Sequence, residues 1–155
     1  MKVATICFCL KKNEVLLGMK KRGFGAGKWN GFGGKVKEGE QIKSTATREI
    51  FEEAGIQVEE AALQQVAIIQ FYFESEPVFE DHIFLVKEWE SEAKESEEMR
   101  PQWYAIDKLP FDEMWAGDCR WMPLILSGKK IEGRLIYNSD GTLVKEFLWN
   151  ERKFD

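Results

Sequence analysis

The fold of this chain is decided by one stretch, residues 34 to 56, which reads Gly34-Lys-Val-Lys-Glu-Gly-Glu-Gln-Ile-Lys-Ser-Thr-Ala-Thr-Arg-Glu-Ile-Phe-Glu-Glu-Ala-Gly-Ile56. Its part from Lys43 to Ala54 contains neither Gly nor Pro and predicts a helix, with Ser44 or a neighbour as the N-terminal cap. Gly55 stands where a residue in the left-handed conformation ends a helix. The sequence therefore predicts one well-defined helix directly after a glycine-rich segment.

Two sides of this helix differ in character. Side chains three or four positions apart lie on the same side, so Glu49, Glu52 and Glu53 are predicted to project together, with Glu52 and Glu53 facing solvent. The apolar stripe on another side packs against the core and consists of Ala46, Ile50 and Ala54.

The acidic side predicts a site for a divalent cation. Like charges at this spacing destabilise a helix by roughly 0.2–0.5 kcal/mol per pair, and only Arg48 lies near enough in the sequence to offset them. A hard cation prefers several carboxylate oxygens and takes substrate phosphates as further ligands, so we expect Mg²⁺. A solvated acidic surface is the alternative for an isolated pair of glutamates, but the longer pattern disfavours it.

That longer pattern is Gly-x5-Glu-x7-Arg-Glu-x-x-Glu-Glu-x-Gly, and an accidental match to its seven fixed positions is on the order of one in a million. The stretch resembles the Nudix box of the Nudix hydrolases. The resemblance implies a hydrolase of nucleoside diphosphates linked to another group, with Mg²⁺ or Mn²⁺ as the cofactor. The roles that it implies by position are metal ligands at Glu52, Glu53 and Gly33, a ligand or base at Glu49, an orienting residue at Arg48 and a supporting acid at Glu40.

Length and charge predict one soluble domain that does not bind a nucleic-acid polymer. A chain of 155 residues is long enough for a single domain, residues 1–155, and too short for two ordinary ones. Its formal net charge is -5, whereas proteins that bind the backbone of DNA or RNA present a basic surface. We therefore expect a monomer that binds a small nucleotide.

The three cysteines form no C-x-x-C pair, so they predict neither a disulfide framework nor a zinc site. Cys7 and Cys9 share a face of one predicted strand. Together with Cys119 they are expected to be small buried apolar residues in a reducing compartment. The longest apolar stretch, residues 3–10, is too short to span a membrane. A cytoplasmic protein without a membrane contact is the expectation.

Strand-like segments surround the helix. The predicted strands are residues 2–10, 14–21, 63–73, 82–89, 103–106, 131–138 and 143–149. Residues 88–98 hold six glutamates in eleven positions and predict a solvated loop. A second helix is predicted over 118–126, with Trp121, Leu124 and Leu126 inward. This order predicts an α+β fold, and the resemblance implies the Nudix α/β/α sandwich with a mixed β-sheet between helices.

Segments outside the box carry a closer resemblance. They are Gly18 to Gly27, Trp29 to Lys35, Glu98 to Pro101, Pro110-Phe111 and Met114-Trp115. They are similar to the oxidised purine nucleoside triphosphatase branch of the family, that of the animal MutT homologue. This resemblance implies hydrolysis of 8-oxo-dGTP, with 2-oxo-dATP as a further candidate, to the monophosphate and pyrophosphate. Such a reaction keeps damaged precursors out of DNA.

The closer resemblance also implies roles for residues outside the box. These are base recognition by Asn30, Trp115 and Asp118, pocket walls at Phe24 and Phe71, a pocket lining at Thr5, a phosphate or sugar contact at Lys20, and a metal ligand or base at Glu98. Considered without the resemblance, Trp115 is equally compatible with core packing, since most tryptophans of a small domain serve the core.

One departure from the family pattern concerns the base. The pattern has two adjacent acids after Met-Trp, whereas this chain has Ala116-Gly117-Asp118. A carboxylate accepts two hydrogen bonds from a guanine edge, while an adenine edge presents an acceptor at N1. We therefore expect weaker activity on adenine-type substrates such as 2-oxo-dATP than on 8-oxo-dGTP. The substitution Gly117→Asp is expected to broaden the range of substrates.

Two alternative functions stay open. The substrate can be another nucleoside diphosphate derivative, such as a dinucleoside polyphosphate or a nucleotide sugar, or the chain can be a nucleotide-binding module without turnover. The complete set of box acids favours turnover. His82, the only histidine, lies in an apolar predicted strand, so we expect a structural role and a base other than histidine.

Overall fold

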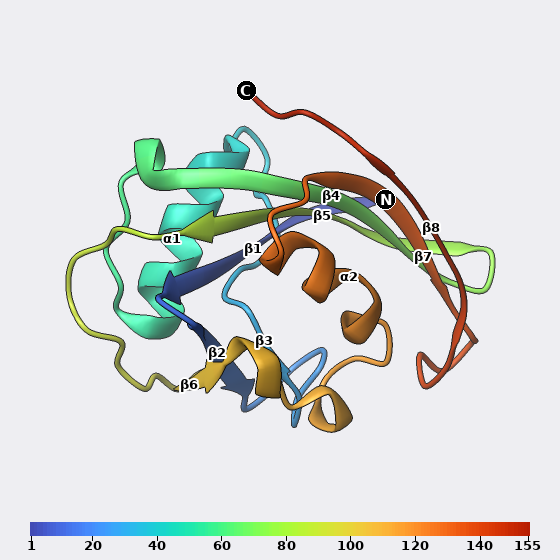
Figure 1. Ribbon diagram of the computed structural model, residues 1–155, viewed down its shortest axis with the longest axis horizontal. Helices are drawn as coiled ribbons and strands as arrows, with labels where there is room; N and C mark the ends of the chain where they lie inside the picture. Colours follow the sequence, from blue (N-terminus) through green and yellow to red (C-terminus); the bar gives the residue numbers. More distant parts are fainter.

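The computed structural model describes residues 1–155. The strands are β1 (Lys2–Lys11), β2 (Glu14–Lys20), β3 (Trp29–Asn30), β4 (Leu63–Phe73), β5 (Glu76–Val86), β6 (Met99–Ala105), β7 (Ile131–Tyr137) and β8 (Val144–Glu151). The helices are α1 (Ile42–Ala54) and α2 (Asp118–Leu126), with single 3₁₀ turns η1 (Glu60–Ala62), η2 (Ile106–Lys108) and η3 (Phe111–Glu113). Figure 1 shows the two helices beside long, twisted strands.

The strands form one mixed sheet in the order β3-β2-β1-β5-β4-β7-β8, and β6 pairs with β2. β1 runs parallel to β5, and β4 runs parallel to β7. The other pairs are antiparallel, including the β1–β2 hairpin and the β4–β5 hairpin. Because β1 and β5 lie side by side in the middle of the sheet, residues at their ends can reach either helix.

Two apolar clusters hold the helices to the sheet. Ala46, Ile50 and Ala54 of α1 belong to a cluster of 12 buried residues that also includes Cys7 and Cys9. Trp121 and Ile125 of α2 belong to a separate cluster of 17 buried residues. Alternate residues of a strand point to opposite faces, so the sheet is covered by one helix on each side. The predicted α/β/α arrangement is confirmed.

Most predicted element boundaries are confirmed, and the differences have local causes. β5 begins at Glu76, before the predicted start at 82, because its first residues already pair with the end of β4. Pro77 is tolerated there because it stands at the start of the strand. β6 begins at Met99, before the predicted start at 103, because all residues from Met99 to Ala105 pair with β2. In α2, Met122 and Ile125 are buried with Trp121, whereas Leu124 and Leu126 are only partly buried. Cys119 is exposed, so the expectation that it is buried is wrong.

Helix α1 ends as predicted but starts differently. Gly55 adopts φ 69° and ψ 14°, and its N–H donates to the Phe51 carbonyl, which closes the helix in the left-handed conformation. The N-terminal cap is Gln41, not Ser44, and no side chain caps the first turn. Thr45 Oγ1 instead donates to Glu40 Oε1 at 2.6 Å. The start of α1 is therefore held by the supporting acid of the box.

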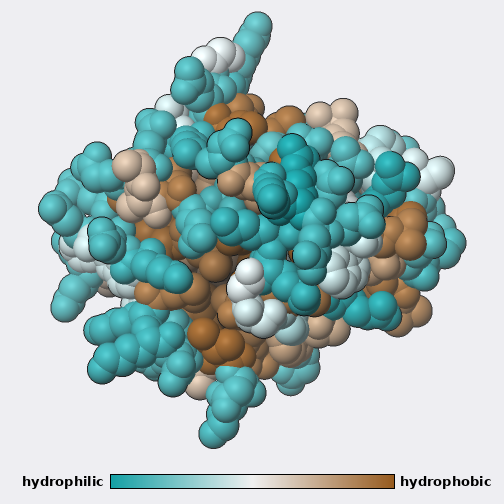
Figure 2. Space-filling model, turned by 45° about the horizontal axis from the view of Figure 1, so that its top comes forward, coloured by the Kyte–Doolittle hydropathy of each residue, from teal (hydrophilic) through white to brown (hydrophobic).

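No helix of the structure is both long and apolar enough to cross a membrane. On the face drawn in Figure 2, hydrophobic side chains gather in a hollow that hydrophilic side chains border. Apolar surface bordered by charge is suited to a ligand with an apolar ring and a charged portion.

Neighbouring residues of α1 provide a test of this packing. Ile50 has no exposed surface (0%) and Phe51 is 51% exposed. We expect Ile50→Ala to lower the free energy of unfolding by about 2–5 kcal/mol, because it leaves a cavity between α1 and the sheet. Phe51→Ala is the matched control and should lower it by about 1 kcal/mol or less. Denaturant titration of both variants measures the difference, and equal losses would contradict this packing.

Candidate active site

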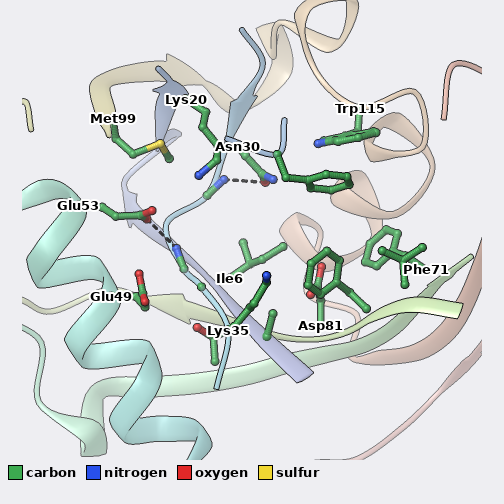
Figure 3. A pocket seen from close by; sticks show the side chains of 18 of the residues that line it. Ile6, Lys20, Asn30, Lys35, Glu49, Glu53, Phe71, Asp81, Met99 and Trp115 are labelled. Atoms are coloured by element: carbon green, nitrogen blue, oxygen red, sulfur yellow. Dashed lines mark hydrogen bonds between the residues drawn. The ribbon is translucent and has the colours of Figure 1, made fainter. Parts of the chain in front are cut away.

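One cavity of about 530 Å³ lies between α1, β1, β5 and α2. That volume is within the usual range for a small-molecule site. Every predicted site residue except Arg48 lines this cavity: Thr5, Lys20, Phe24, Asn30, Gly33, Glu49, Glu52, Glu53, Phe71, Glu98, Trp115 and Asp118. Figure 3 shows Glu49 and Glu53 at one end and Trp115 and Phe71 at the other.

The acidic end is built where the segment after β3 passes between β1 and α1. This segment pairs with β1, since Thr5 N–H donates to the Gly34 carbonyl at 2.9 Å and Cys7 N–H to the Phe32 carbonyl at 2.7 Å. The Gly33 N–H is then free to donate to Glu53 Oε1 at 2.9 Å (Figure 3). The glycine-rich segment and the helix are thus joined through one glutamate.

Gly33 can occupy this position only because it lacks a side chain. A Cβ atom at Gly33 would lie 1.7 Å from the Thr5 carbonyl oxygen, and one at Gly34 would lie 2.4 Å from the Glu49 carboxyl carbon. Both contacts are far inside van der Waals distance. The two glycines therefore allow the backbone to approach both β1 and the acids of α1.

Glu53 is buried, with 2% of its surface exposed. The prediction that it faces solvent is wrong, because the glycine-rich segment packs against it and the Gly33 N–H donates to its carboxylate. Burial raises the pKa of Glu53 to about 8, and the charges of Glu49 and Glu98 act in the same direction. Glu52 does face solvent, with 54% of its side chain exposed.

Arg48 does not line the cavity but connects the acids behind it. Its Nε and Nη2 donate to the two carboxylate oxygens of Glu40 at 2.7 and 3.0 Å. Its Nη1 donates to Glu49 at 2.8 Å and to Glu52 at 3.3 Å. These hydrogen bonds hold the pKa of Glu40 well below its usual range. One guanidinium thus fixes the directions of three carboxylates.

The acidic end supplies hard oxygen donors, although no three acidic, histidine or cysteine side chains already stand as a metal-binding group. Two of the acids are turned toward Arg48. The third, Glu53, has a single backbone N–H as its partner and like charges around it. A divalent cation offsets that repulsion with the oxygen ligands it prefers, so the residues present fit such an ion.

The loop before β6 brings Glu98 to this end. Ser96 Oγ donates to the Glu53 carbonyl at 2.7 Å and accepts from the N–H groups of Glu98 and Met99 at 3.3 and 3.1 Å. Residues 88–98 form the predicted loop, and its last part is tied to the end of α1. Lys20 of β2 also lines the acidic end, where its charge lowers the pKa of Glu53.

The other end of the cavity is aromatic. Phe24 stacks on Trp115 with ring centroids 5.0 Å apart and an interplanar angle of 27°. Phe73 lies 6.2 Å from the Trp115 ring and 5.8 Å from the Tyr137 ring. Trp115 therefore borders the cavity and also touches the core. Because a ring inserted between Phe24 and Trp115 needs about 7 Å, Phe24 must move aside before a base can take that place.

Two buried polar atoms of the cavity lining have no partner in the protein, Thr5 Oγ1 and Asp118 Oδ2. Asp118 is 3% exposed, and its other oxygen accepts from Trp121 Nε1 at 3.2 Å. Burial raises the pKa of Asp118 to about 7. Asn30 of β3 lines the same cavity, with its own Oδ1 accepting from the Gly31 N–H at 2.8 Å. A buried polar atom without a hydrogen-bond partner costs free energy of folding. A ligand that hydrogen-bonds to Thr5 Oγ1 or Asp118 Oδ2 would therefore offset that cost.

Sequence reasoning missed one acid, Asp81 of β5, which also lines the cavity. Burial raises the pKa of Asp81 to about 7. A signal was present in the sequence, because Asp81 alternates with Phe79 and Ile83 on the face where apolar residues are expected. His82, its neighbour, points to the opposite face and is held by Gln65 and Glu80.

Gly117 has no room for a side chain. A Cβ atom there would lie 2.3 Å from Leu135 Cδ2 and 2.7 Å from the Tyr137 hydroxyl. The Gly117 N–H also donates to that hydroxyl at 3.2 Å. The expectation that Gly117→Asp broadens the substrate range stays a prediction, and the new side chain would require Leu135 and Tyr137 to shift.

Residues 1–125 match the family model described as NUDIX domain. The chain belongs to the Nudix family. Among curated proteins it is 47% identical over 148 residues to the oxidized purine nucleoside triphosphate hydrolase of Danio rerio, covering 95% of this chain and 94% of that protein. It is 46% identical to the protein of the same name from Mus musculus, covering 93% and 92%.

A solved structure agrees with this assignment. The MutT protein from Bacillus halodurans is 27% identical and superposes with a TM-score of 0.81, covering 97% of this chain and 98% of that chain. The two chains therefore share one fold over almost their whole lengths.

Asp118 allows a test of the buried acid. Its pKa is about 7 in the folded protein and about 3.9 in an unfolded chain. Between these values the folded state binds more protons, so the free energy of unfolding falls as the pH rises. Asp118→Asn lacks this titration, and we expect its stability relative to wild type to increase from pH 5 to pH 8. Denaturant titration at several pH values measures this, with the exposed-acid variant Asp112→Asn as the control. A difference that does not change with pH would contradict the burial of the charge.

Proposed function

We propose that this Nudix protein hydrolyses oxidised purine nucleoside triphosphates, 8-oxo-dGTP among them, to the monophosphate and pyrophosphate. The observation that carries the proposal is the division of one cavity into two ends. Glutamates of α1 line one end, and an aromatic wall with a buried acid lines the other. A nucleotide has the same two parts, a phosphate chain that binds through a cation and a flat base that stacks.

We propose Mg²⁺, with Mn²⁺ as a substitute, as the ion at the acidic end. Glu52 and Glu53 would hold it, with Glu49, Glu98 and the Gly33 carbonyl as further candidates. The bound ion would neutralise negative charge on the substrate phosphates, which is the main requirement of phosphoryl transfer.

The protein's own residues position the reaction. Arg48 holds the carboxylates of Glu49 and Glu52 in fixed positions beside the cavity while pairing with Glu40. Lys20 places a positive charge near the same end, where it attracts the phosphate chain. A carboxylate at this end accepts the proton of the attacking water, and Glu49 and Glu98 are the candidates because both line the cavity.

At the other end, Trp115 offers a face for the base, with Phe71 as a wall. Stacking on an aromatic side chain is worth about 1–3 kcal/mol per base. Asp118 and Asn30 carry the polar atoms that distinguish one purine from another, since they reach the cavity from α2 and β3. The high identity to relatives named for oxidised purines supports this choice of base.

Glu52→Gln tests the acidic end. Glu52 is exposed, so the variant should unfold at the wild-type temperature. We expect kcat to fall about a hundredfold or more, because a charged oxygen that holds the cation is lost. Glu59→Gln, an exposed glutamate after the box and outside the cavity, should retain wild-type turnover. A Glu52→Gln enzyme within threefold of wild type would overturn the assignment.

A substrate panel tests the function itself. Steady-state kinetics with 8-oxo-dGTP, 2-oxo-dATP and dGTP in Mg²⁺, with pyrophosphate and phosphate measured separately, should show the highest kcat/KM for an oxidised purine and release of pyrophosphate. A dinucleoside polyphosphate and a nucleotide sugar complete the panel. Preference for either of these, or binding without turnover, would refute the proposal.

A further inference from the structure

One wall of the cavity carries a carboxylate where the sheet otherwise presents apolar side chains. Asp81 lies opposite Ala4 on β1 and opposite Ile69 on β4. Two residues further on, Ile83 belongs to the apolar cluster beneath α2, as does Ile69. Side chains at directly paired and alternate positions share a face. An aliphatic side chain would therefore suit this position better than Asp81 does, because no charged group would have to be removed from water.

No group of the protein stabilises the charge of Asp81. Burial alone raises its pKa, with no hydrogen bond or ion pair acting in the other direction. Asp81 is partly buried where it lines the cavity, and a carboxylate that loses water there without gaining a partner costs free energy of folding. The position is thus unfavourable for the protein alone, and a ligand with hydrogen-bond donors is the partner that would offset the cost.

Asp118 lines the same cavity as Asp81. The charge of Asp81 raises the pKa of Asp118, and both acids raise the pKa of the Tyr137 hydroxyl. Asp118 Oδ2 is buried without a partner, and both aspartates line the cavity. In Figure 3, Asp81 lies toward Phe71 and Trp115, away from Glu49 and Glu53. The two acids therefore belong to the base end and not to the acidic end.

We propose that Asp81 is a second base-recognition residue, and that it and Asp118 hold one proton between them and so present both a donor and acceptors to the purine edge. This proposal rests on the proposed function, and it identifies a residue that determines which purine bases the enzyme accepts. Two carboxylates in one poorly hydrated site do not both ionise near neutral pH, and they share the remaining proton as a pair. One ionised and one neutral carboxyl group is the expected state.

One neutral and one ionised carboxyl group can pair with more kinds of purine edge than a single carboxylate can. The guanine edge presents donors at N1 and the amino group beside an acceptor at O6, whereas an adenine-type edge places a donor beside a ring acceptor. An ionised carboxylate only accepts hydrogen bonds, so it serves the donors and leaves the acceptor unsatisfied. The neutral partner supplies the missing donor. The single acid of Ala116-Gly117-Asp118 therefore does not imply a narrow range, because β5 provides the second one.

The test compares Asp81→Val with Asp81→Asn. Valine suits a strand position lined by apolar residues, so Asp81→Val should fold and unfold at or above the wild-type temperature. We expect it to raise KM for 2-oxo-dATP about tenfold or more, and KM for 8-oxo-dGTP less, because the donor is lost. The value of kcat should stay within about threefold, since the acidic end is unchanged. Asp81→Asn keeps an N–H donor and should recover most of the 2-oxo-dATP activity.

A control and a binding measurement complete the experiment. Glu76→Gln changes an exposed acid on the same strand, outside the cavity, and should leave both KM values unchanged. Calorimetry with 2-oxo-dAMP in EDTA should show the same weakening for Asp81→Val without any catalysis. If wild type hydrolyses neither oxidised nucleotide, the proposed function itself fails. If wild type hydrolyses them but Asp81→Val keeps the wild-type KM ratio, or Asp81→Asn recovers no more than Asp81→Val, only the role of Asp81 is overturned.

Discussion

The burial of carboxyl groups inside one cavity is the constraint on which the rest of this structure depends. Glu53 and Asp118 are almost completely buried, on helices that cover opposite faces of the sheet. Each costs free energy unless a hydrogen bond or a ligand compensates. The protein supplies each with one donor, the Gly33 N–H for Glu53 and the Trp121 indole for Asp118. The second oxygen of each carboxyl group has no hydrogen-bond partner in the protein.

The sheet determines how these acids can share one cavity. β1 and β5 are parallel neighbours in its middle, and the segment after β3 extends the sheet across β1 toward α1. This segment contributes Gly31, Gly33 and Gly34 to the lining of the cavity. Its acidic end is made mainly by residues 33–53, to which Lys20 and Glu98 are added, while its base end combines β3, β5 and α2. This division explains why the two ends can differ so strongly in polarity.

The same division explains what the sequence could predict. The acidic end depends on helical periodicity and two adjacent glycines, which are local signals, and the residues predicted there line the cavity with Arg48 behind them. The burial of Glu53 could not be predicted, because the chain that covers it lies twenty residues earlier. Asp81 was missed for a related reason. Its significance appears only when β5 is paired between β1 and β4, which places it opposite α2.

The contact between Phe24 and Trp115 has a kinetic consequence. Phe24 is 55% exposed and sits in a loop where Gly23, Gly25 and Gly27 all have positive φ. Separating the two stacked rings costs about 0.5–1.5 kcal/mol, whereas the acidic end is already open. Because this cost is small and Phe24 is exposed, its ring can leave the Trp115 face on the fast timescale of side-chain rotamer changes, so that face becomes accessible without a slow step.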